Sequence, residues 1–149
     1  MIDLGLAIAH HILVFGLVIM LAGESALARQ GLSPLDVKRL AGLDIGYGAT
    51  ALLIVVVGIH RVIFGAKGYA FYVENVWFWA KMGTFALIGL LSIVPTKRIR
   101  AWKKALKADP AALPSPAEVA HVRGHIRLQI LLIFAVVAFA ATMARYSGI

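Results

Sequence analysis

The sequence predicts an all-helical integral membrane protein, built as an antiparallel bundle of four transmembrane helices in one domain. Three observations support this prediction: four long apolar runs, a hydrophobic fraction of 61%, and a charged fraction of only 15% in 149 residues. Soluble domains contain about 45–50% apolar and about 25% charged residues. The runs lack alternation of apolar and polar residues, and the chain is too short for a closed barrel with its loops.

The start and end of each helix follow from local signals. We expect helices over about residues 4–29, 34–63, 76–107 and 116–146. Gly31 is a typical C-terminal stop for the first helix. Residues 33–36 (Ser-Pro-Leu-Asp) and 115–118 (Ser-Pro-Ala-Glu) each supply an N-cap serine, a proline in the first turn and a capping acid, so they start the second and fourth helices. Asn75 is the candidate cap of the third helix.

Basic side chains are concentrated around two of the three connections. Eleven Lys and Arg residues lie in or beside the first and third connections, whereas three lie on the opposite side. The positive-inside rule therefore puts both loops in the cytoplasm and both termini outside, toward the periplasm if the host is a Gram-negative bacterium. The net charge of +8 is explained by this membrane surface, so we expect lipid and no nucleic acid as a partner. Asp3, with no early Lys or Arg, argues against a cleaved signal peptide.

Aromatic residues mark the expected membrane interfaces. They cluster over residues 69–79, where we expect an interfacial belt, with a substrate-stacking surface as the alternative. Trp102 is expected at the opposite interface. Residues 97–107 are basic with apolar residues between the charges, which predicts an amphipathic segment that lies against anionic lipid.

Titratable side chains inside the apolar runs are the candidate functional residues, because each costs about 2.5–3.5 kcal/mol to insert. An outer group comprises His10, His11, His60, Arg61 and Lys81. An inner group comprises Glu24, Asp44, His121 and His125. Helical phase puts Glu24 within about 40° of His10 and points His11 elsewhere. Asp44 and His60 lie about 160° out of phase, so they face different neighbours.

The inner group has two interpretations. In the structural one, Glu24 pairs with Arg29, and Asp44 pairs with Lys38 or a histidine. In the functional one, the two carboxyls form a proton or cation path. His121 and His125, four residues apart, have the spacing of a metal site, although solvation at the membrane interface is the preferred interpretation.

Two glycines four residues apart, Gly42 and Gly46, favour close approach of helices. We expect packing within the bundle, with a homodimer interface as the alternative. The absence of cysteine excludes disulfides, thiolate metal sites and iron–sulfur clusters.

The outer group suggests a haem site. A histidine of the first helix, His10 or His11, and His60 of the second are expected at a similar depth. Two imidazoles from antiparallel helices can ligate the iron of haem b as axial ligands. Arg61 and Lys81 would then pair with the haem propionates.

Several segments resemble a family of short bacterial four-helix inner-membrane proteins of unknown function. They are Ala9-His10-His11, Arg61-Val62, Lys67-Gly68 with Tyr72, Lys81, and Ser92-Ile93-Val94-Pro95-Thr96 before a basic stretch with Trp102. More distantly, the chain is similar to the HemJ-type protoporphyrinogen oxidases and CopD-type membrane proteins. Those groups carry a histidine in the first helix, here His10 or His11, and the HemJ type carries an early lysine in the third, here Lys81. This resemblance implies the fold and b-type haem.

Three functions remain open from the sequence. The first is a small redox protein that transfers electrons through haem b. The second is a proton-coupled carrier or ion-conducting oligomer, in which Glu24 and Asp44 relay charge and Lys81 gates the outer end; four helices enclose little volume, so this function implies a dimer. The third is a structural accessory subunit of a membrane complex. No phosphate loop, catalytic triad or dense acid cluster points to an enzyme class.

Overall fold

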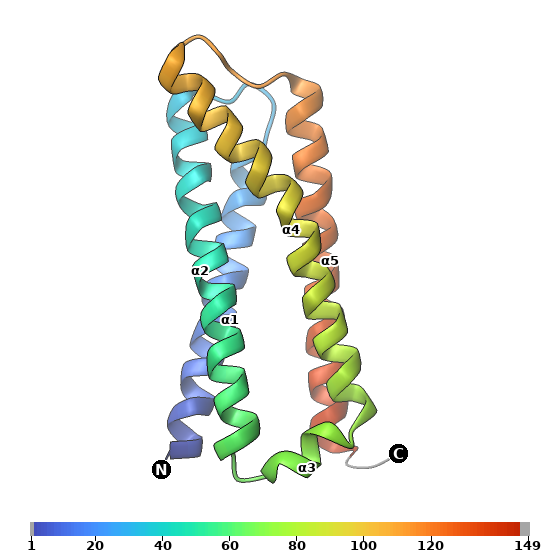
Figure 1. Ribbon diagram of the computed structural model, residues 1–149. Coiled ribbons are helices and arrows are strands. Elements are labelled where there is room, and N and C mark those ends of the chain that lie inside the picture. The colour runs from blue at the N-terminus through green and yellow to red at the C-terminus, as the bar shows by residue number, and fades with distance from the viewer. Residues whose placement is uncertain (1, 147–149) are drawn as a thin grey trace.

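The computed structural model describes residues 2–146, which form helices and connections without a strand (Figure 1). The helices are α1 (Ile2–Leu27), α2 (Pro34–Phe64), α3 (Gly68–Val73), α4 (Val76–Ala108) and α5 (Pro116–Arg145). Four of them, α1, α2, α4 and α5, are long and apolar enough to cross a membrane. The predicted all-helical membrane fold is therefore confirmed, and the long helices begin and end within two residues of the predicted boundaries.

The two ends of the bundle differ. The N-terminus, α3 and the C-terminal end of α5 lie together at what we call the terminal end, and connections 28–33 and 109–115 lie at the other, the loop end (Figure 1). The short helix α3 was not predicted. It forms within the aromatic segment and buries Tyr72.

Local capping explains where the helices start. Ser33 and Asp36 form a capping box, in which the Ser33 backbone N–H donates to the Asp36 carboxylate over 3.0 Å. Ser115 and Glu118 repeat this arrangement at the start of α5, also over 3.0 Å. The Asn75 side chain accepts from the backbone of α4. These bonds satisfy N–H groups that have no partner inside the helix, as the sequence signals predict.

The long helices pack as two pairs. Helix α1 lies mainly against α2, and α4 lies mainly against α5. The pairs contact each other chiefly through α2 and α4, and α4 leans across toward α2 at the loop end (Figure 1). Most fully buried apolar side chains belong to the half of the bundle near the loop end, among them Leu21, Val37, Leu40, Ile99, Val122 and Ile126. The half near the terminal end is less tightly closed.

Trp102 corrects one expectation. It is not an interfacial anchor but a core residue, 5% exposed, with Ile99 at 0% and Leu106 at 9% on the same face of α4. These side chains join the core cluster that α2 and α5 build at the loop end. Their spacing of three and four residues creates one apolar face, and here neighbouring helices cover that face instead of lipid.

The outer surface of the bundle is apolar. Large exposed apolar side chains occur on every long helix, including Ile12, Phe15, Ile19, Leu52, Leu53, Leu90, Leu131 and Phe134. Water-soluble monomers rarely expose continuous apolar surfaces of this kind. In a lipid bilayer these side chains contact acyl chains, so their exposure carries no hydrophobic free-energy cost.

The aromatic residues expected at the interface fall into two groups. Tyr69 and Trp79 are exposed, whereas Tyr72 and Phe78 are buried.

The glycine pair divides between two environments. A Cβ on Gly46 would lie 3.0 Å from the sulfur of Met20, so Gly46 permits close packing of α1 on α2. A Cβ on Gly42 would meet nothing within 4 Å, and Gly42 is exposed. Packing within the bundle therefore explains Gly46. A homodimer interface through Gly42 stays a prediction.

Candidate functional site

Polar side chains from all four long helices meet in the half of the bundle nearer the loop end. We call this set the polar layer; its members are Glu24, Asp44, Tyr47, Thr96 and Gln129. Glu24 is 2% exposed, Asp44 and Tyr47 are each 4% exposed, and Gln129 is 1% exposed. On α1, α2 and α5, these polar residues lie on the same helix face as the buried apolar residues that form the core.

Two hydrogen bonds cross between the helix pairs within the polar layer. The Tyr47 hydroxyl donates to Oε1 of Gln129 over 2.9 Å, which joins α2 to α5. The Thr96 hydroxyl donates to Oδ1 of Asp44 over 2.5 Å, which joins α2 to α4. The sequence did not predict Tyr47, Thr96 or Gln129 as site residues, because their hydroxyl and amide side chains carry no charge at neutral pH. A glutamine at the start of a long apolar run was the available signal.

The two carboxyls of the polar layer keep free oxygens. Oε1 of Glu24 and Oδ2 of Asp44 are buried and have no hydrogen-bond partner. The charge of Asp44 acts on Glu24, and the charge of Arg100 acts on Asp44 from beyond ion-pair distance.

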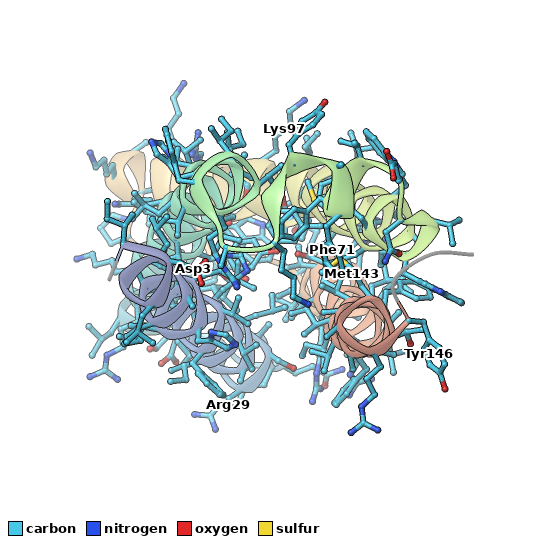
Figure 2. All side chains as sticks on the ribbon, turned by 90° about the horizontal axis from the view of Figure 1, so that it is seen from below. Asp3, Arg29, Phe71, Lys97, Met143 and Tyr146 are labelled. Atoms are coloured by element: carbon cyan, nitrogen blue, oxygen red, sulfur yellow. The ribbon has the colours of Figure 1, made fainter. Side chains whose placement is uncertain are left out.

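The expected pairing of Glu24 with Arg29 and of Asp44 with Lys38 is absent from the described residues, where the ion pair observed is Arg98 with Glu118 at 3.8 Å. Arg29 follows the end of α1 and projects away from the bundle, as Figure 2 shows from the terminal end. The Arg29 guanidinium therefore does not reach the buried carboxyl of Glu24.

A second group lies nearer the terminal end, which we call the basic cluster: His10 of α1, Arg61 of α2 and Lys81 of α4. Both Arg61 and Lys81 lie close enough for their charges to act on the His10 ring. The ring rests against α2, with Cε1 3.9 Å from where a Cβ of Gly58 would stand. The Lys81 Nζ lies 5.1 Å from the centre of the Phe78 ring. The structure thus brings together three of the five outer residues.

The other two outer residues, His11 and His60, face away from the cluster. Both are exposed, and Nδ1 of each contacts a carbonyl oxygen of its own helix: Ala7 at 2.6 Å for His11 and Val56 at 2.8 Å for His60. His60 lies two positions from Gly58, which puts it on nearly the opposite face of α2. The arrangement therefore identifies His10 as the inward histidine and does not bring His60 toward it. Haem ligation stays a prediction.

His121 and His125 stack edge to face on α5, with ring centres 4.7 Å apart. The Nδ1 of His125 lies 3.1 Å from the carbonyl oxygen of His121. No third His, Asp or Glu joins them as a possible metal ligand in the described part of the chain. Two imidazoles at an exposed edge agree with the interfacial interpretation.

An apolar stretch separates the polar layer from the basic cluster. His10 and Glu24 are fourteen positions apart on α1, a rise of about 21 Å. Leu17 of α1, Ile54 of α2 and Ile88 of α4 are buried between the two levels. Thr50 of α2 is also buried at this level, but its hydroxyl donates to the sulfur of Met20 over 3.7 Å, so no hydrogen bond among the described residues links the polar layer to the basic cluster.

The fold and these buried groups define a small multi-pass membrane protein with titratable side chains inside its helix bundle. Comparison with known families matches residues 2–148 to the family described as "Predicted membrane protein (DUF2214)". The chain belongs to that family, which confirms the resemblance to membrane proteins of unknown function. Comparisons with curated proteins and with solved structures give no match. The similarity to HemJ-type and CopD-type proteins is not shown.

Proposed function

We propose that this protein is a proton-coupled membrane carrier in which Glu24 and Asp44 take up and release protons. The observation that carries the proposal is the pair of buried carboxyls, each with one oxygen that has no hydrogen-bond partner. An ionisable group inside a membrane protein is expensive and commonly marks a proton or ion pathway. A carboxyl held by a permanent salt bridge serves structure, whereas these two have no such partner among the described residues.

The rest of the polar layer supports proton exchange. Tyr47, Thr96 and Gln129 place hydroxyl and amide groups beside the carboxyls, and their two bonds cross between the helix pairs. Loss of these bonds would let α1 and α2 move relative to α4 and α5. The apolar stretch at Leu17, Ile54 and Ile88 closes the route toward the terminal end in the present conformation. Alternating exposure of the carboxyls therefore requires the two helix pairs to separate there.

Proton flux into sealed vesicles tests the proposal. The purified protein is reconstituted in liposomes that hold a pH-sensitive dye, and a potassium gradient with valinomycin supplies the driving force. We expect flux above that of empty liposomes, reduced about tenfold or more in Glu24→Gln and Asp44→Asn, because an amide cannot exchange the proton. Glu118→Gln is the matched control, since glutamine preserves the capping box at an exposed acid. Equal flux in wild type, Glu24→Gln and Asp44→Asn would contradict the proposal.

A second candidate is the binding of haem b near the terminal end. It is favoured by one observation: Nδ1 of His10 is buried without a hydrogen-bond partner beside two cationic side chains suited to propionates. The donor set supplies one axial histidine and does not supply His60 as the second. An absorption spectrum of the purified protein tests this candidate, with a Soret band lost in His10→Ala as the supporting result and a colourless protein that takes up no haemin as the opposing one.

A further inference from the structure

The basic cluster concentrates positive charge that no acid balances. Arg61 and Lys81 carry this charge and the His10 ring lies beside them; the three side chains come from three helices and all are at least half-buried. No carboxylate of the described residues lies within ion-pair distance of Arg61 or Lys81. Asp3, in the first turn of α1, lies beside the end of α2, with Oδ1 3.3 Å from where a Cβ of Gly65 would stand, and it forms no ion pair with Arg61. Two cations are thus held together without an ion-pair partner among the described residues.

Two nitrogen atoms of the cluster are also left without partners. Nε of Arg61 and Nδ1 of His10 are buried and make no hydrogen bond. A buried donor without an acceptor loses its hydration and gains nothing in return. An anionic group placed between α1, α2 and α4 would accept from Nε of Arg61, and from Nδ1 of His10 in the tautomer that carries its proton there, and would balance the charge. The positive charges of Arg61 and Lys81 repel any further cation, such as a metal ion.

We propose that the basic cluster binds a phosphate group at the terminal end of the bundle. A guanidinium presents a planar fork of N–H donors that matches phosphate oxygens, and a lysine ammonium adds a point charge. Arg61 precedes the end of α2 by three residues and Lys81 follows the start of α4 by five, so both lie within about 8 Å of a helix end. This depth gives access to a phospholipid headgroup and to free phosphate alike. The shared chemistry is a phosphate anion.

The test separates these two sources. Delipidated protein in nonionic detergent and phosphate-free buffer is titrated in one arm with inorganic phosphate and in the other with short-chain phosphatidylglycerol. Sodium chloride keeps the ionic strength constant, and the tryptophan fluorescence and thermal midpoint report binding. We expect saturable binding in at least one arm, weakened about tenfold or more in Arg61→Gln and Lys81→Met. Binding in the first arm identifies free phosphate, and binding in the second alone identifies the headgroup.

The control variant is Lys67→Gln, which removes an exposed lysine at the same end and is expected to bind as wild type does. If Arg61→Gln does not fold, Lys81→Met alone is sufficient to test the proposal. The absence of saturable binding in both arms would overturn the proposal, as would undiminished binding in the cluster variants. The site shares no residue with the polar layer, so Glu24→Gln should bind phosphate normally, and a failure of proton flux would leave this result unaffected.

Discussion

Glu24→Leu is expected to unfold less readily than the wild-type protein while it loses proton transport. The wild-type carboxyl is 2% exposed and has an oxygen without a hydrogen-bond partner. An apolar side chain of similar size removes that desolvation cost, which amounts to about 1–3 kcal/mol for a buried polar group. The free energy of unfolding, followed by SDS titration in mixed micelles, should therefore rise by about this amount. Functional sites often hold residues that lower stability in this way.

Gln129→Leu is the matched control from the same layer. It breaks the bond from the Tyr47 hydroxyl and leaves that hydroxyl buried without an acceptor. We expect its unfolding free energy to fall, by about 0.6–1.7 kcal/mol on the scale of hydrogen bonds between membrane helices. If Glu24→Leu instead destabilises the protein as Gln129→Leu does, the carboxyl fixes the helix arrangement. That outcome would favour the structural accessory subunit over the carrier.

Trp102→Ala should produce the largest loss of stability among the aromatic residues. The indole is 5% exposed within the core at the loop end, and truncation of a buried Trp to Ala costs about 3–5 kcal/mol. Trp79→Ala is the natural comparison, because Trp79 is 58% exposed near the terminal end. Its replacement should change the unfolding free energy little in detergent. A loss in Trp102→Ala as small as that in Trp79→Ala would contradict the core position of Trp102.

The boundaries of the helices could be predicted from the sequence because the signals are local. The capping boxes at Ser33 and Ser115 act between residues three positions apart, and the structure confirms both. The long apolar runs require helices in lipid, since every backbone group must be hydrogen-bonded within the segment. Neither argument needs knowledge of the neighbouring helices.

The site could be predicted only in part, because helical phase states which residues share a face and not what that face contacts. Helical phase places His10 and His11 on different faces of α1. The rotation of α2 about its own axis, which turns Arg61 inward and His60 outward, is set by packing against the other helices. The sequence shows the apolar face of α4 around Trp102, but it does not show that α2 and α5, and not lipid, cover that face. Long basic side chains such as Arg29 were expected to reach inward and instead extend outward, where water solvates them.

The central functional claim is that the Glu24 carboxyl exchanges a proton inside the bundle, and pH-induced infrared difference spectroscopy measures this directly. Wild-type protein in lipid should show a protonated-carboxyl carbonyl band that changes with pH and shifts in heavy water. We expect Glu24→Gln to remove a component of this band and Glu118→Gln to retain it. Identical difference spectra in wild type, Glu24→Gln and Asp44→Asn would show that neither carboxyl exchanges a proton inside the bundle.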